Sequence, residues 1–250
     1  MRPPCDSPFA DRTVVVLAPV RSGTTWLVEL LLGHPALGGL SWESTVFLGL
    51  WDFWENAHRA DGEGVGAYLG GDDIAATLRR FCDEVFANAD SEWFVEKTPD
   101  NVNRVPLIAT AYPDAWYIHL IRDGRDVVRS QVAAPWGTND PADAARNWVW
   151  AVRQVRRHQW RLGRYREVKY EDLIDDPVGQ TTALLEWMGL PVDGEVAAAI
   201  KERVGHEMAR YGATDRIGAG KWTAMSDGDL RHIHEVAGDL LAELGYTDQR

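Results

Sequence analysis

The chain has 250 residues, of which 45% are apolar and 26% are charged, and its formal net charge is −12. This length and composition predict one α/β domain, residues 1–250, that is large enough for a proper core. The negative charge argues against a broad nucleic-acid-binding surface, but it is compatible with a local basic pocket for an anionic ligand.

The sequence gives no sign of membrane insertion or export. No apolar run approaches the length of a membrane span, and residues 1–8 lack the apolar segment of a signal peptide. Cys5 and Cys82 are the two cysteines of the chain. We therefore expect a reduced, cytoplasmic protein in which neither thiol is catalytic.

The stretch 13–32 combines a strand, a turn and a helix. Val14–Leu17 is an apolar, β-branched run bounded by Pro19, which predicts a short buried strand. A small-residue turn at 21–23 follows, and the apolar pattern of residues 24–32 predicts a helix. Backbone N–H groups in such a turn, together with the helix dipole, form an anion site.

The side chains of this turn suit a small anionic group. Gly23 allows close approach of the backbone, Arg21 adds a positive charge, and hydroxyls come from Ser22, Thr24 and Thr25. The spacing is that of a Walker A loop, but Thr24 stands where a lysine would reach the β- and γ-phosphates of a nucleotide. We therefore expect a smaller anionic end than that of ATP or GTP. An ordinary strand-to-helix turn with chance hydroxyls is the alternative.

The remaining pattern alternates strands and helices, which predicts a parallel sheet covered by helices on both faces. The expected elements are a short strand and turn at 38–45, a helix at 46–55, a loop at 60–71, a helix at 72–87, a strand at 93–97, a helix at 100–111, a strand at 115–121, a turn and helix start at 122–130, a helix at 140–162, a strand at 167–170, helices at 177–188 and 194–204, a polar loop at 206–223 and a helix at 227–244.

Chemically active side chains follow several of the predicted strands. Arg21, Glu43, Lys97, Arg122 and Tyr170 all stand at or just after a strand's carboxyl end. Because these ends share one edge of a parallel sheet, where ligands bind, we expect the five side chains to meet in one site.

Four segments of the chain resemble sulfotransferases, the enzymes that use 3′-phosphoadenosine-5′-phosphosulfate (PAPS). Arg21–Trp26 resembles their 5′-phosphosulfate loop, and Leu120–Ser130 resembles their 3′-phosphate segment. Lys169–Leu173 is similar to the segment whose tyrosine lies by the adenine, and Ile217–Trp222 is similar to the late loop that closes over the nucleotide. The run from Glu96–Pro99 to the serine segment resembles the bacterial and tyrosylprotein branch of the family more than its cytosolic aryl branch.

The resemblance implies a P-loop-like sulfotransferase fold that binds PAPS and releases adenosine 3′,5′-bisphosphate (PAP). Two separate phosphates need two anion sites, and an arginine fork beside a hydroxyl at a helix start suits the second. Tyr170 would border the adenine, with a place in the core as the alternative. The implied nucleotide-binding residues are Arg21, Ser22, Gly23, Thr24, Thr25, Trp26, Arg122, Ser130, Tyr170, Arg216, Gly218 and Lys221.

Three residues are implied in the chemistry. Arg21 would stabilise charge on the bridging oxygen, and Lys97 would hold the sulfuryl group. Glu43 would take the proton of an acceptor hydroxyl as a general base. The alternatives are a solvent-facing Glu43 and a Lys97 that pairs with Glu96 or Glu92.

The acceptor is expected to be a small or medium-sized hydroxyl compound: a metabolite, lipid, sugar or peptide natural product. Apolar side chains usually line such pockets, although core packing is the alternative for each of them. The candidates are Trp42, Phe47, Trp51, Trp54 and Trp136.

No metal cofactor is expected. His232 and His234 fall in a predicted surface helix, and His119 lies inside a predicted buried strand as a core histidine. Two rival functions remain open at this stage. They are a kinase that uses ATP and a nucleotide-binding protein without catalytic activity.

Overall fold

The computed structural model describes residues 7–39, 43–48, 51–57, 69–89, 91–211 and 217–246. Within these residues the chain forms a five-stranded sheet in the order β2-β3-β1-β4-β5, and every neighbouring pair is parallel. This confirms the expected fold class. The strands are β1 (Thr13–Leu17), β2 (Leu37–Gly39), β3 (Trp93–Glu96), β4 (Trp116–Ile121) and β5 (Arg164–Lys169).

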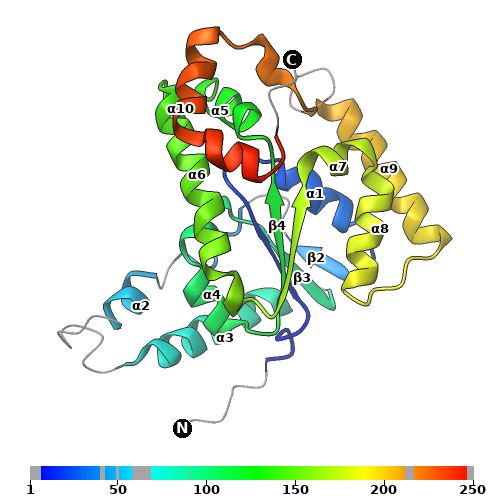
Figure 1. Ribbon diagram of the computed structural model, residues 1–250. Helices are drawn as coiled ribbons and strands as arrows, with labels where there is room; N and C mark the ends of the chain where they lie inside the picture. The colour runs from blue at the N-terminus through cyan, green and yellow to red at the C-terminus, as the bar shows by residue number, and fades with distance from the viewer. Residues whose placement is uncertain are drawn as a thin grey trace.

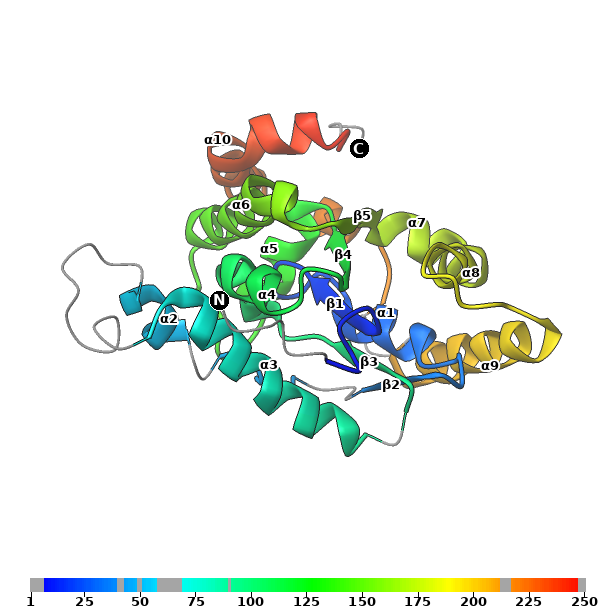
Figure 2. The same cartoon turned by 90° about the horizontal axis from the view of Figure 1, so that it is seen from below.

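Helices cover both faces of the sheet, as Figures 1 and 2 show. Side chains of a strand alternate between its two faces, so Val14 and Val16 of β1 pack on one side and Val15 and Leu17 on the other. The first side carries α1 (Thr24–Leu31), α7 (Tyr170–Asp175), α8 (Pro177–Trp187) and α9 (Gly194–Tyr211). The second carries α3 (Gly71–Ala87), α4 (Val105–Ala111) and α6 (Pro141–His158).

Two further helices pack against α6 and continue the second layer. They are α5 (Gly124–Val132), directly after β4, and α10 (Asp227–Glu243) near the end of the chain. Figure 1 shows both beside the upper half of α6. The short helix α2 (Trp51–Ala57) lies near α3, on the side of the sheet opposite to α8 and α9 (Figure 2). No helix within the described ranges is long and apolar enough to cross a membrane.

Several sequence-based boundaries are wrong. The strand predicted at 167–170 is β5, which begins at Arg164 and ends at Lys169 because Tyr170 starts α7, and the helix predicted at 140–162 is α6, which ends at His158. The predicted helix at 46–55 begins at Trp51, because 46–48 form a turn that buries Phe47. The predicted helix at 100–111 divides into a 3₁₀ helix, Pro99–Asn103, and α4. Residues 206–211 are the last turns of α9 rather than loop, because Glu207 on this stretch is still buried and pairs with Arg210. A single glycine before them costs a helix only about 1 kcal/mol.

His119 is a core histidine, as predicted. It is fully buried on β4, and its Nδ1 lies 2.8 Å from the Tyr165 hydroxyl, which donates to Glu167. Nδ1 therefore donates its proton, and Nε2 has no partner within the described ranges. Burial lowers the pKa of His119 below its usual value because protonation would place a charge at Nε2.

This lowered pKa predicts a loss of stability in mild acid. Below about pH 6.5 the unfolded chain takes up a proton at His119 that the folded protein does not bind, so the free energy of unfolding falls as pH falls, by up to about 1.4 kcal/mol per pH unit. In His119→Asn, whose amide can donate in place of Nδ1, this part of the slope should vanish. Chemical denaturation of both proteins between pH 7.5 and 5.5 measures it, and equal slopes would contradict the assignment.

Candidate active site

The carboxyl ends of β1, β3 and β4 surround a cavity of about 210 Å³. The five residues predicted to meet at this edge all line it, which confirms their juxtaposition. The lining residues are Val20, Arg21, Gly23, Thr24, Thr25, Trp26, Glu43, Lys97, Pro99, Arg122, Ser130, Trp136, Tyr170 and Ile217.

The sheet topology explains why the cavity lies here. After β1 the chain turns into α1 on one face, whereas after β3 and β4, the two neighbours of β1, it continues into helices of the other layer. Such a switch point leaves a crevice outside the strand ends. The loop after β1 forms its floor.

The loop after β1 has a strained backbone that turns it sharply into α1. Arg21 has a φ of 72° and Gly23, at the N-cap of α1, a φ of 91°. A Cβ on Gly23 would lie 2.3 Å from Cε2 of Tyr170. Glycine is therefore required at this position for two reasons, the left-handed backbone angle and the lack of space for a side chain.

Several buried donors of the site have no partner among the residues that the structure describes. They are the Ser22 hydroxyl, the Trp26 indole N–H and Nε of Arg122. Buried donors are normally satisfied, so three such groups around one loop indicate a polar ligand. An anion with several oxygens fits this donor set.

Arg21 and Ser130, each predicted to contact an anion, are joined in this structure. Nε of Arg21 donates to the Ser130 hydroxyl at 2.8 Å, and the guanidinium lies 5.9 Å from the ring centre of Trp136. Arg21 is exposed to solvent. Ser130 lies in the last turn of α5 rather than at a helix start, as the sequence predicted, because α5 begins at Gly124. The loop and the end of α5 therefore form one continuous polar surface.

Arg122 connects three segments of the site through its guanidinium. Its guanidinium is 5% exposed, lies 4.4 Å from the ring centre of Tyr170, and donates to the backbone oxygens of Arg21 at 3.2 Å and Gly218 at 2.9 Å. The Tyr170 hydroxyl accepts the N–H of Gly218 at 3.4 Å. Arg122 and Tyr170 thus connect the first loop to the late segment 217–222.

Glu43 and Lys97 stand on the other side of the cavity. Glu43 is exposed, whereas Lys97 is buried with its Nζ 3.4 Å from the Thr25 hydroxyl. Burial lowers the pKa of Lys97, and the charge of Glu43 opposes this shift most strongly. A lysine beside a carboxylate, both facing one cavity, can stabilise an anionic group and accept a proton next to it.

Glu96 is fully buried and points away from Lys97 into a set of neutral donors. It accepts hydrogen bonds from Ser44 at 2.6 Å, from Thr98 at 2.8 Å and from Asn101. Burial raises the pKa of Glu96. Because Ser44 follows Glu43, this carboxylate fastens the segment that carries the candidate base to the end of β3.

Of the described residues predicted to line the acceptor pocket, one lines the cavity and the others pack in or against the core. Trp136 lines the cavity and is 63% exposed, whereas Phe47 is fully buried and packs on Tyr112 in the core. Trp51 and Trp54 stack on each other, with ring centres 5.3 Å apart, and pack against the core. Trp42, and Arg216 of the late loop, lie outside the described residues.

In the late segment, Lys221 curls back so that its Nζ donates to the Ile217 oxygen at 2.8 Å. The sequence did not mark two further residues, Glu96 as an anchor and Asp126 on α5. Asp126 could have been noticed, because it lies four residues before Ser130 and so on the same face of α5. Nothing in the sequence shows that Ser44 packs onto Glu96.

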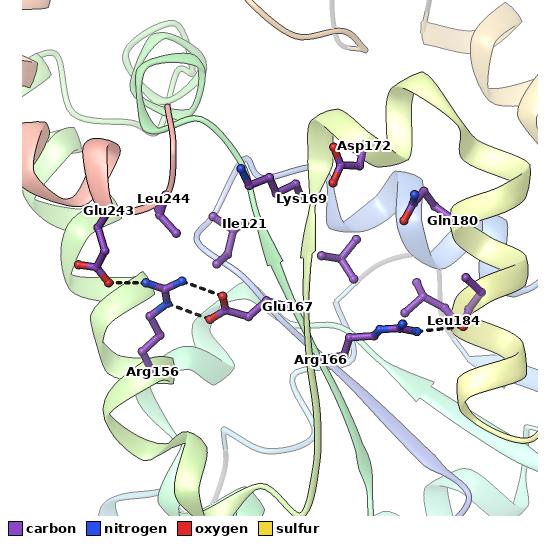
Figure 3. A pocket seen from close by; sticks show the side chains of 12 residues that line it. Ile121, Arg156, Arg166, Glu167, Lys169, Asp172, Gln180, Leu184, Glu243 and Leu244 are labelled. Carbon is purple, nitrogen blue, oxygen red and sulfur yellow. Dashed lines mark hydrogen bonds and ion pairs between the residues drawn. The ribbon is translucent and has the colours of Figure 1, made fainter. Parts of the chain in front are cut away.

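A larger cavity, about 420 Å³, lies along the outer edge of β5 (Figure 3). Its main charges satisfy one another: Arg156 pairs with Glu167 and Glu243, and Arg166 donates to the Ala183 oxygen. It shares no residue with the loop after β1. The smaller cavity is therefore the candidate active site.

No group of three or more histidine, cysteine, aspartate or glutamate side chains is arranged to hold a metal ion in the part of the chain that the structure describes. The donors and cations around the smaller cavity are suited to an anion.

Residues 13–194 match the model of the Sulfotransferase family. The chain therefore belongs to this family. It is 30% identical over 213 residues to an uncharacterized protein of Aquifex aeolicus (strain VF5), covering 78% of this chain and 28% of that protein. It is 30% identical over 97 residues to carbohydrate sulfotransferase 1 of Rattus norvegicus, covering 36% of this chain and 24% of that protein. The chain thus spans about a quarter of the length of these relatives.

Solved structures share the fold. The sulfotransferase domain of the Synechococcus PCC 7002 olefin synthase is 20% identical with a TM-score of 0.62, covering 99% of this chain and 98% of that one. Sulfotransferase STF9 of Mycobacterium avium is 15% identical with a TM-score of 0.63, covering 96% and 78%. Mouse sulfotransferase SULT7A1, complexed with PAP, is 14% identical with a TM-score of 0.58, covering 94% and 87%.

The contact of Gly23 with Tyr170 predicts the effect of a single methyl group. Gly23→Ala should lower the free energy of unfolding by about 3 kcal/mol, because left-handed strain and a collision with a packed ring add together. Gly189→Ala is the matched control, because Gly189 also has a positive φ, of 77°, but has open space around its Cβ position. It should cost about 1 kcal/mol. Equal losses in urea denaturation would show that the ring contact is unimportant.

Proposed function

We propose that the chain transfers a sulfuryl group from PAPS to the hydroxyl of a small or medium-sized acceptor, giving a sulfate ester and PAP. One observation carries the proposal. A single cavity combines an anion loop without the Walker lysine, a second basic site at Arg122 and Ser130, and the pair Glu43 and Lys97.

The nucleotide would bind across the loop and the last turn of α5, which carries Ser130. The N–H groups at the N-terminus of α1, with the hydroxyls of Ser22, Thr24 and Thr25, bind the 5′-phosphate. Ser130 and Arg122 bind the 3′-phosphate, and Tyr170 borders the adenine. The partnerless Ser22 hydroxyl and Arg122 Nε support this fit, because both are buried donors close to the loop.

The reaction needs positioning and charge stabilisation rather than a covalent intermediate. The acceptor oxygen forms a bond to sulfur while the bond from sulfur to the bridging phosphate oxygen breaks. Glu43 takes the acceptor proton, Lys97 holds the sulfuryl oxygens, and Arg21 stabilises the charge that stays on PAP. Arg21 would have to leave Ser130, its partner in this structure, to do so.

The acceptor would enter beside Trp136, an exposed ring at the wall of the cavity. An aromatic face suits a sugar ring or another flat, partly apolar molecule. One relative is named a carbohydrate sulfotransferase, which makes sugars reasonable first acceptors to test. A cytoplasmic location and the absence of a nucleic-acid partner remain parts of this proposal.

The role of Glu43 predicts a separation of turnover from binding. Glu43→Gln should lower kcat by about a hundredfold to ten-thousandfold because the acceptor proton has no base. Its Kd for PAP should stay unchanged, because Glu43 lies on the acceptor side. The measurement is transfer of labelled sulfur from PAPS to a panel of phenols, sugars and peptides, with calorimetry for PAP.

Glu92→Gln is the matched control, because Glu92 is an exposed glutamate before β3, at the opposite end of the strand from the cavity. It should leave both quantities unchanged. Full turnover in Glu43→Gln would remove Glu43 from the mechanism. PAP binding without transfer to any acceptor would favour the inactive nucleotide-binding protein.

A further inference from the structure

A buried carboxylate stands where the proposed function calls for positive charge. Asp126 lies on α5 between Arg122 and Ser130, four residues from each, and is 2% exposed. A negative charge so close to a phosphate site would repel the ligand unless other groups satisfy it. Its position therefore needs an explanation.

The carboxylate of Asp126 is directed at the late segment 217–222. Its Oδ1 accepts the N–H of Trp222 at 2.7 Å, and its Oδ2 accepts the N–H of Gly220 at 2.8 Å. Nη2 of Arg122 lies 3.6 Å from Oδ2. The charge is thus compensated by two backbone donors and one guanidinium, and both oxygens are occupied.

The same segment is tied to the site at its other end. Gly218 accepts from Arg122 and donates to Tyr170, two residues that line the cavity. Trp222 is buried, and the guanidinium of Arg125 lies 3.7 Å from its ring centre. Asp126 therefore fixes 220–222, while Arg122 and Tyr170 fix Gly218.

We propose that Asp126 is a positioning residue that fastens the segment 217–222 to the start of α5 and thereby sets the affinity of the site for the 3′-phosphate of its nucleotide. This inference rests on the proposed function. Release of the segment frees the Gly218 oxygen from Arg122, so the guanidinium loses one of the two backbone contacts that fix its position. The 5′-phosphate loop keeps its own backbone contacts, from the Ser22 N–H to the Pro19 oxygen at 3.2 Å and from the Leu27 N–H to the Gly23 oxygen at 3.2 Å. Its affinity for a 5′-phosphate therefore changes less than that of the 3′-phosphate site.

The test compares two nucleotides that differ in one phosphate. Calorimetry measures the Kd of PAP and of adenosine 5′-monophosphate for the wild-type chain and Asp126→Asn. The asparagine oxygen can accept one of the two N–H groups, and its amide opposes the other. PAP affinity should fall by about tenfold to a hundredfold, while that of the monophosphate changes by less than about twofold.

Asp193→Asn is the matched control. Asp193 also accepts two backbone N–H groups, from Glu195 at 3.0 Å and Val196 at 2.9 Å, but at the start of α9. This variant should bind both nucleotides as the wild-type chain does. An equal loss for both nucleotides in Asp126→Asn, or no loss for either, would overturn the inference.

A measurement on the wild-type chain covers the case in which Asp126→Asn does not fold. Hydrogen exchange at the amides of Gly220 and Trp222 should slow when PAP binds and not when the monophosphate binds. Equal protection by both nucleotides would overturn the inference alone. A wild-type chain that does not bind PAP would overturn the proposed function and this inference with it.

Discussion

The buried guanidinium of Arg122 is the interaction on which the site depends. It joins the Arg21 oxygen after β1 to the Gly218 oxygen of the late segment, and it packs on Tyr170 at the end of β5. A buried charge is costly without partners, so three segments far apart in sequence must meet around it. The remaining Nε has no partner in the described protein, which leaves Arg122 able to bind an anion.

An acidic protein can hold an anion site because cations gather there and the buried carboxylates nearby are engaged by other segments, which leaves Glu43 as the carboxylate that lines the cavity among the described residues. The chain carries a net charge of −12, yet Arg21, Lys97 and Arg122 gather at one sheet edge. The buried carboxylates Glu96 and Asp126 each accept hydrogen bonds from other segments. They therefore act as anchors, one for the segment of Glu43 and one for the late segment.

Local sequence was enough to predict which functional residues follow which strands. It was not enough to predict the contacts that hold these residues in place. The β-branched run before Arg21 predicts a strand and a phosphate loop, and strand ends in a parallel sheet must share an edge, so Lys97 and Arg122 could be placed together. The roles of Glu96 and Asp126 depend on which distant segments pack on them. Phe47 could not be assigned to the core because a turn, not the expected helix, sets its direction.

The central claim is that the site binds a nucleotide with phosphates on both its 5′ and 3′ positions. The loop without the Walker lysine binds the first phosphate, and Arg122 and Ser130 bind the second. Calorimetric titration of the wild-type chain with PAP in the absence of a divalent cation, and with ATP in the presence of magnesium, tests it most directly. The account predicts that PAP binds at least about a hundredfold more tightly, because ATP has no 3′-phosphate for Arg122 and Ser130. ATP binding as tight as PAP, in the presence of magnesium, would contradict it.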